Sequence, residues 1–335
     1  MNEKLSVMEL LKRAAKLLLF SNISLPFFLF LCSLPLFCFL IFFELSLQTT
    51  VSLTYQFLSQ ELELGGYFYL QDHKDLSEND LVPWLIQTSL LYFFPYALLD
   101  LLTTTVIVAA SSVSYTSEDE EPLGLLCLVQ RSTKICRKRL LGCLITSLYV
   151  LLLSTSVFFG FFSDSVNYLF VFSLSRDYKN FYYHTGVLFH AVVALIHGTV
   201  FIVLAVKFGK WSAGWNMGLV VSVLEEEDGK GGIYGTNALS LSYWYGRGHE
   251  KRDLLMMLMF SVFAIVTRMP CLYSTCSERS SGNGVLYTGI YVGLICVGNV
   301  VKWVACVVSY YDCRARVLEK KDDVEIGSKA KAFAT

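Results

Sequence analysis

Long apolar runs separated by shorter polar segments dominate this sequence. The first run, Ser24 to Phe43, holds no charged residue. At the helical rise its length is about 30 Å, the thickness of the hydrocarbon core of a bilayer. The run continues into polar residues without a small-x-small cleavage site, so we expect a membrane-spanning helix rather than a signal peptide.

Five further runs pass the same test of apolar length, so we predict six transmembrane helices. They lie at about 24–43, 83–110, 140–162, 184–206, 254–276 and 285–310. The fifth run is the least regular, because it is uncharged only from Leu254 to Thr267, before Arg268 and Pro270. A re-entrant segment is the alternative there and would reverse the orientation of the last span. The predicted fold class is an all-α integral membrane bundle, and the low charged fraction of 16% agrees with it.

The basic residues predict the orientation of the chain. Twenty-one Lys and Arg lie in the N-terminal segment, the second and fourth connections and the tail, whereas the three alternate connections hold five. Because basic residues next to a span stay on the cytoplasmic side, we expect both termini in the cytoplasm. The plasma membrane and the endoplasmic reticulum are not distinguished. The predicted organisation is an interfacial amphipathic helix (1–20), a six-span domain (21–312) and a polar cytoplasmic tail (313–335).

Basic segments that we expect to be amphipathic helices precede the first, third and fifth spans. In the first, charged residues and apolar residues fall on opposite stripes at helical spacing, which predicts a helix lying in the membrane interface. Basic clusters of this kind attract anionic lipid headgroups at about 1 kcal/mol per Lys or Arg. The alternative is that orientation alone requires these charges. The candidate headgroup contacts are Lys12, Arg13, Lys16, Lys134, Arg137, Lys138, Arg139, Lys251 and Arg252.

Two charged residues fall inside predicted spans at similar depth, Asp100 in the second and Lys302 in the sixth. A lone charge there costs at least about 2.5 kcal/mol, so a partner inside the bundle is expected. We hypothesise an ion pair between Asp100 and Lys302, with Arg268 as the competing cation. A structural role is favoured over proton transfer.

Other polar and small residues in the spans point to helix packing. His190 and His197 share one face of the fourth span and are predicted to hydrogen-bond to another helix, a proton relay or metal site being the alternative. Gly289 and Gly293 form a GxxxG step, extended by Gly298, that permits close helix approach and a helix-mediated oligomer.

The ten cysteines show no spacing typical of zinc ligands. Cys271 and Cys276 are candidates for a small disulfide on the outer side. Cys127, Cys136 and Cys313 lie near the inner interface, where palmitoylation is conceivable. The acidic outer connection from Glu44 to Asp80 is expected to be a solvated loop whose first part, Val51 to Leu58, prolongs the first helix, cation binding being the alternative.

The sequence contains no recognisable catalytic motif. The stretch 228–232 lacks the spacing of a P-loop, and His249-Glu250 is followed by Asp253 where a zinc protease motif needs its second His. A GxSxG elbow is absent as well. We therefore expect no enzyme, no cofactor and no metal. A net charge of -1 gives no basic field for nucleic acid.

Several short segments carry a family resemblance. They are Lys138-Arg139-Leu140-Leu141, Val220-Val221-Ser222-Val223-Leu224-Glu225-Glu226, Gly235, Ala238-Leu239-Ser240 and Gly246-Arg247. Together with the six-run layout, they resemble a large family of plant multi-pass transmembrane proteins of unknown function, over roughly Met8 to Tyr311. The resemblance implies a six-helix bundle with cytoplasmic termini. It implies no catalytic residues, and Asp100 departs from the small or apolar residue expected there.

Two classes of function follow from these observations. The first is a non-enzymatic membrane-organising or interaction protein that uses its basic cytoplasmic helices on membrane lipids. The alternative is a small-solute transporter or channel that uses Asp100, Lys302 and the face shared by His190 and His197. The first is favoured because few polar groups lie inside the spans.

Overall fold

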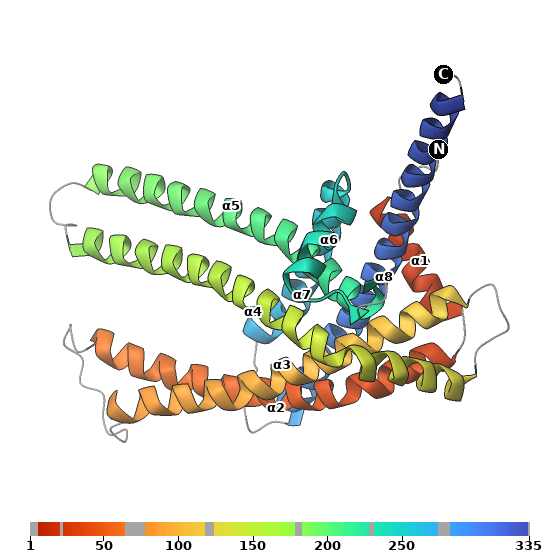
Figure 1. Cartoon of the computed structure of the whole chain (residues 1–335). Coiled ribbons are helices and arrows are strands. Elements are labelled where there is room, and N and C mark those ends of the chain that lie inside the picture. Colours follow the sequence, from red (N-terminus) through yellow and green to blue (C-terminus); the bar gives the residue numbers. More distant parts are fainter. Residues whose placement is uncertain are drawn as a thin grey trace. The chain divides into compact units, whose positions relative to one another are not determined.

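The computed structural model describes residues 6–20, 23–63, 78–117, 124–177, 183–227, 231–273 and 282–333. These residues form an all-α protein, as predicted, with one short hairpin (Figure 1). The hairpin pairs β1 (Glu226–Glu227) with β2 (Gly231–Gly232) in antiparallel fashion. The helices are α1 (Val7–Phe20), α2 (Ser24–Glu63), α3 (Glu78–Thr116), α4 (Leu125–Asp177), α5 (Tyr183–Leu224), α6 (Thr236–Gly246), α7 (Glu250–Tyr273) and α8 (Gly282–Phe333).

Helix α1 is the expected N-terminal amphipathic helix. The backbone N–H of Glu9 donates to Ser6 Oγ at 3.2 Å, and the Ser6 N–H donates to Glu9 Oε2 at 3.0 Å. This reciprocal capping box satisfies two donors at the start of the helix. Its buried stripe holds Val7, Leu10, Ala14 and Leu17. Lys12, Arg13 and Lys16 are exposed.

Among the described residues, five helices are long and apolar enough to cross a membrane. The candidate spans are Ser24–Leu45 in α2, Phe93–Thr116 in α3, Leu125–Tyr168 in α4, Ala191–Leu224 in α5 and Val285–Glu319 in α8. The sequence predicts six. The difference is α7, which does form a helix over the predicted fifth span. Its uncharged run is bounded by Asp253 and Arg268 and reaches only about 21 Å at the helical rise.

Several helices are longer than the spans predicted within them, α4 and α8 by the most residues. Helix α4 begins at Leu125, so the basic segment before the third predicted span forms the first turns of the same helix. Helix α8 continues without a break to Phe333, so the predicted polar tail is helical. Its first residues pack into the protein, because Cys313 is buried.

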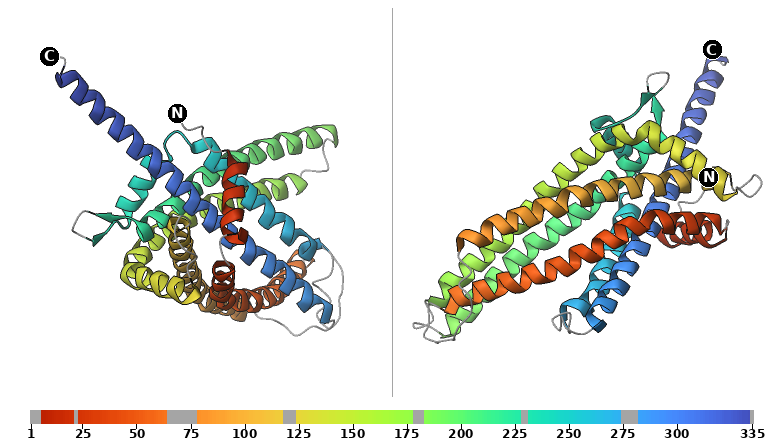
Figure 2. Two further views of the ribbon diagram at one scale, coloured as in Figure 1. Left: turned by 90° about the vertical axis from the view of Figure 1, so that its right-hand side faces the viewer. Right: turned by 90° about the horizontal axis from the view of Figure 1, so that it is seen from below.

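The chain divides into two compact units. The second unit comprises Ala15–Thr133 and Phe260–Val304. In it, α2 and α3 run side by side (Figure 2). A core cluster of α8 side chains, Tyr291, Val292 and Cys296, packs against Phe37, Leu40 and Ile41 of α2.

The first unit comprises Met1–Ala14, Lys134–Met259 and Ala305–Thr335. Its helices α4 and α5 lie antiparallel (Figure 1) and join through aromatic side chains, Phe161 with Phe201 at 5.0 Å and Phe158 with Phe208 at 5.4 Å between ring centroids. Large apolar side chains on both helices face outward. Leu152 of α4 and Leu195 of α5 are 67% and 71% exposed, as expected of surfaces in contact with lipid.

The register of this helix pair differs from the predicted spans. Asp164 lies just beyond the end predicted for the third span, whereas His197 lies well inside the predicted fourth. His197 Nδ1 is nevertheless 2.8 Å from Asp164 Oδ1. The two predicted spans therefore face each other over only part of their length, as at Phe161 and Phe201, because the helices extend further past the third span than apolar length indicated.

Candidate functional site

Glu225 is the centre of a polar cluster in the first unit. It directly follows α5, where its backbone N–H donates to Val221 O at 2.8 Å. Its side chain is buried, and its Oε1 accepts hydrogen bonds from the hydroxyls of Tyr245 at 2.9 Å and Tyr310 at 2.6 Å. Arg314 Nε lies 3.3 Å from the same oxygen. One carboxylate thus connects the end of α5 to α6 and α8.

Burial and the contact with Glu225 together perturb the titration of the Tyr245 hydroxyl. Burial, followed by the hydrogen bond to the Glu225 carboxylate, raises the pKa of Tyr245 to about 12. The hydroxyl therefore remains a hydrogen-bond donor throughout the physiological pH range.

The next residue, Glu226, binds a different pair of cations. Its carboxylate pairs with Lys138 at 2.9 Å and with Arg139, both on α4. The hydrogen bond from Lys138 and the charge of Arg139 hold the pKa of Glu226 below its ordinary value. Arg139 also donates to Tyr234 Oη at 3.2 Å, and only 4% of its side chain is exposed.

Gly235 connects the hairpin to α6. Its φ of 61° is in the region that favours glycine, and its N–H donates to Thr146 Oγ1 of α4 at 2.9 Å. We call Glu225, Glu226 and the side chains that contact them the polar junction; those side chains are Lys138, Arg139, Tyr234, Tyr245, Tyr310 and Arg314. The segments that carry the family resemblance, 138–141, 220–226 and the short motifs between 235 and 247, meet at or beside it.

A second ionic cluster joins α7 to α8 in the same unit. Arg252 pairs with Asp253 at 3.1 Å and with Asp312 at 2.7 Å, and it donates to Ser309 Oγ at 2.8 Å. Burial opposes the charge of Arg252, but the two carboxylates keep its pKa above the ordinary value. Burial raises the pKa of Asp253, although Arg252 counteracts it. Arg316 Nη2 also contacts Asp312, at 3.3 Å.

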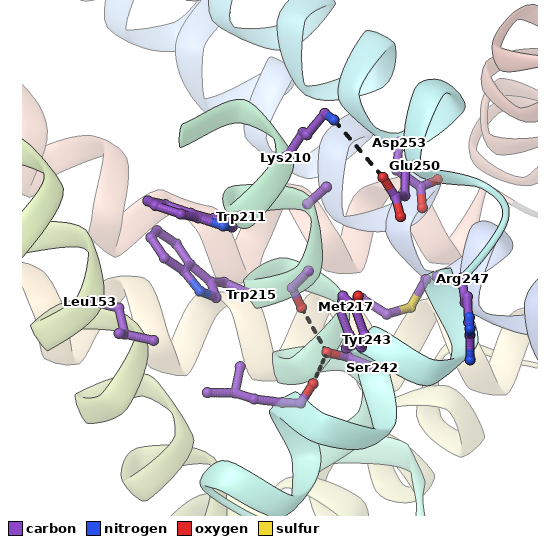
Figure 3. Close-up of a pocket in the computed structure, with 14 residues that line it drawn as sticks. Leu153, Lys210, Trp211, Trp215, Met217, Ser242, Tyr243, Arg247, Glu250 and Asp253 are labelled. Carbon is purple, nitrogen blue, oxygen red and sulfur yellow. Dashed lines mark hydrogen bonds and ion pairs between the residues drawn. The ribbon is translucent and has the colours of Figure 1, made fainter. Parts of the chain in front are cut away.

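A cavity of about 350 Å³ opens beside these clusters, between α5, α6 and the start of α7 (Figure 3). Ser242 lies at its base and donates to Leu239 O at 2.7 Å and Gly214 O at 3.0 Å. Its lining residues are Leu153, Lys210, Trp211, Ala213, Gly214, Trp215, Met217, Leu239, Ser242, Tyr243, Gly246, Arg247, Glu250 and Asp253. A volume of this size is at the lower end of the range of small-molecule sites.

The second unit contains the charged residues predicted inside the spans. Asp100 of α3 interacts electrostatically with Lys302 of α8. Among the described residues, however, the two form no ion pair within 4.0 Å, and Lys302 Nζ lies 4.5 Å from the ring centroid of Trp303. Arg268, the competing cation, instead contacts Glu44 at 2.9 Å. Glu44 was expected to begin a solvated loop, but it lies in α2 and is buried.

The nine candidate headgroup contacts fall into two groups. Arg139 and Arg252 are buried in the ion pairs described above, and Lys138 pairs with Glu226, so these three are occupied within the protein. The other six have exposed side chains: Lys12, Arg13, Lys16, Lys134, Arg137 and Lys251. A basic residue next to a span can either contact a lipid headgroup or pair with a carboxylate inside the protein, and the sequence alone does not separate these two roles.

Close helix approach occurs at a different glycine from the two in the GxxxG step. A Cβ added at Gly298 would lie 2.6 Å from Phe263 Cε1 of α7. One added at Gly293 would be 3.7 Å from Phe37, and one at Gly289 would meet nothing within 4 Å. His197 contacts Asp164 of α4, whereas the side chain of His190 and the predicted disulfide between Cys271 and Cys276 lie outside the described residues.

Sequence reasoning missed the contacts of several residues of these clusters, among them Glu44, Tyr310 and Arg314. Each lies far along the chain from its partner, up to 224 positions for Glu44 and Arg268, so no local spacing connects them. For Glu225 the sequence did contain an indication of its importance, because this residue falls in a segment that carries the family resemblance.

The comparisons with known proteins agree with that resemblance in part. A family model described as "Domain of unknown function (DUF8558)" matches residues 3–333. No curated protein and no solved structure matches the chain.

Proposed function

We propose that this chain, which belongs to the DUF8558 family over nearly its whole length, is a six-span, non-enzymatic protein that organises the inner surface of a membrane. Five helices that could span a membrane support the multi-pass part of this proposal. The proposal also includes three more specific statements. They are that α7 adds a span to these five, that the protein is of plant origin, as the family resemblance implies, and that both termini lie in the cytoplasm.

The ion pair between Glu44 and Arg268 supports α7, which covers the predicted fifth span, as one of the six spans. Glu44 lies at the far end of the candidate span Ser24–Leu45, and Arg268 meets it there. From Arg252 to Arg268, α7 rises about 24 Å, most of the thickness of a bilayer core. Outward-facing apolar side chains follow one face of α7 at helical spacing: Leu255, Leu258, Val262, Ile265 and Val266. Such a face is suited to contact with lipid.

The observation that carries the lipid function is the exposure of basic side chains on α1 and α4. Lys12 and Arg13 lie on α1, opposite its buried stripe, and Lys134 and Arg137 lie one turn apart on α4. None of these four has an ion-pair partner among the described residues. Under the proposed topology they are at the cytoplasmic surface, where anionic headgroups attract each basic residue by about 1 kcal/mol.

Spin-labelled lipids test this function in the full-length protein reconstituted in vesicles. Electron paramagnetic resonance should show that labelled phosphatidylglycerol is preferred over labelled phosphatidylcholine at low salt. Each neutralised contact should weaken this preference about fivefold, as expected for about 1 kcal/mol. The variants are Lys12→Gln with Arg13→Gln, and Lys134→Gln with Arg137→Gln. Charge-retaining controls exchange Lys and Arg at the same positions. Equal preference in the Gln variants and the controls would refute the lipid function.

One observation favours the alternative of small-solute transport. In the second unit, Thr104 Oγ1 and Ser111 Oγ of α3 and Trp303 Nε1 of α8 are buried without a hydrogen-bond partner among the described residues. Asp100 lies one turn before Thr104 and interacts with Lys302. Flux of small ions or solutes in vesicles that depends on Asp100, and is lost in Asp100→Asn, would favour transport over membrane organisation.

A further inference from the structure

The cavity of the first unit has an apolar wall and a charged rim. Trp211, Trp215 and Leu153 form one wall, while Lys210, Arg247 and Glu250 lie toward its edge (Figure 3). The polar group at its base, Ser242, already has its hydrogen bond within the protein. Ser242 therefore needs no hydrogen bond from a ligand. The residues that could recognise a ligand are those of the rim and the aromatic wall.

The charges that line the cavity balance. Two cations, Lys210 and Arg247, accompany two carboxylates, Glu250 and Asp253. Lys210 Nζ is 3.9 Å from Glu250 Oε2, and Asp253 pairs with Arg252. Arg247 is exposed and has no ion-pair partner among the described residues. A planar guanidinium in this position is suited to bidentate contact with a phosphate.

The aromatic wall suits a cationic group. The ring centroids of Trp211 and Trp215 lie 6.4 Å apart with an interplanar angle of 32°, and Trp211 is 47% exposed. Trp faces attract ammonium groups, and aromatic recognition of quaternary ammonium is a recurrent use of this attraction. Glu250 supplies a carboxylate on the opposite side of the cavity (Figure 3).

The cavity also adjoins surfaces suited to acyl chains. Leu153 lines it from α4, and its neighbour Leu152 is 67% exposed. Trp residues concentrate at membrane interfaces, and Lys207 and Lys210 mark the cytoplasmic side of α5 under the proposed topology. An occupant would thus have its polar end in the cavity and its apolar end along α4.

We infer that this cavity binds the headgroup of a zwitterionic phospholipid, with the phosphate on Arg247 and the ammonium between the Trp pair and Glu250. The inference rests on the proposed membrane function and names a lipid class for one site. The balanced charges distinguish this site from the exposed basic residues of α1 and α4, which would select anionic lipids. An anionic lipid such as phosphatidylglycerol carries no ammonium group to meet the Trp pair and Glu250.

Native mass spectrometry of the full-length protein tests this site. The protein in detergent is equilibrated with equal amounts of phosphatidylcholine and phosphatidylglycerol of the same chain length. We expect preferential retention of one phosphatidylcholine. Arg247→Gln should weaken this retention about tenfold, the loss expected for one charge-assisted contact. Lys207→Gln is the matched control, because Lys207 is an exposed cation of α5 outside the cavity lining and should leave retention unchanged.

A second pair of variants separates recognition from folding. Trp211→Phe keeps an apolar wall and should reduce retention of phosphatidylcholine, whereas Trp244→Phe, at an exposed side chain of α6 outside the cavity lining, should not. Preferential retention of phosphatidylglycerol, or equal retention in wild type and Arg247→Gln, would overturn the inference. The protein could retain phosphatidylcholine and yet show no preference for anionic lipid that depends on α1 and α4. That result would refute the proposed function but would still support the phosphatidylcholine site.

Discussion

The Arg268 guanidinium lies 2.9 Å from the Glu44 carboxylate and so joins α7 to α2 within the second unit. Arg268 is the residue that made the fifth predicted span irregular. Its charge has a specific partner, which removes the main objection to a helix that continues through this level of the membrane.

Exchanging these two charges tests the contact. Glu44→Arg or Arg268→Glu alone should lower the free energy of unfolding by about 0.6–1.7 kcal/mol, the range of polar interactions measured between membrane helices. The double exchange should recover part of that loss. Denaturant or sodium dodecyl sulfate titration of the purified protein measures both. If the double variant loses as much stability as the two single variants together, the two residues do not form a direct pair.

Glu225 should be the most sensitive carboxylate of the polar junction. Glu225→Gln retains the shape but removes the charge that Tyr245, Tyr310 and Arg314 share, so unfolding should become easier by about 1–3 kcal/mol. Glu319→Gln is the matched control, since Glu319 is exposed on α8 and should change stability by less than about 0.5 kcal/mol. Thermal unfolding in detergent compares the two. Equal effects would show that the junction does not stabilise the first unit.

The raised pKa of Tyr245 predicts a loss of stability at alkaline pH. A tyrosine ordinarily titrates near pH 10, and the folded-state pKa is about 12. The protonated hydroxyl therefore contributes its full stabilisation below pH 10, and this contribution is lost as pH rises from 10 to 12. The melting temperature of Tyr245→Phe should fall less steeply than that of the wild type over this interval. Tyr243→Phe, altered at a neighbouring side chain that is 74% exposed, should follow the wild type.

The close approach of α7 and α8 at Gly298 predicts a steric effect. Gly298→Ala would push a methyl group against Phe263, and overpacking of this kind costs about 1–3 kcal/mol. Gly289→Ala, in open space on the same helix, should be neutral or slightly stabilising. Unfolding in detergent measures both variants, and a larger loss at Gly289 would contradict the observed packing.

The sequence predicted the elements of this fold better than their contacts. Apolar length and basic flanks are local properties, so helices such as α2, α3 and α8 follow from the run that each contains. The pairing of Glu225 with Tyr310 depends on side chains 85 positions apart, which no periodicity records. The sequence does not predict how far α4 and α5 extend past their spans, because a polar residue such as Asp164 ends an apolar run, whereas in the structure Asp164 has a partner in His197.

The candidate lipid contacts show the same limit. Arg139 and Lys134 lie on the same helix and look alike in the sequence, yet Arg139 is buried against Glu226 and Lys134 is exposed. Exposure depends on which face of α4 meets the hairpin. That face is determined by residues about 90 positions further along the chain.

The location of the two chain ends tests the six-span account most directly. Reporters that are active only in the cytoplasm or only outside it, fused in turn to the N-terminus and the C-terminus of the full-length chain, measure it in living cells. Six spans predict that both ends give the cytoplasmic signal. A cytoplasmic N-terminus with an external C-terminus would mean an odd number of crossings and would contradict α7 as a span.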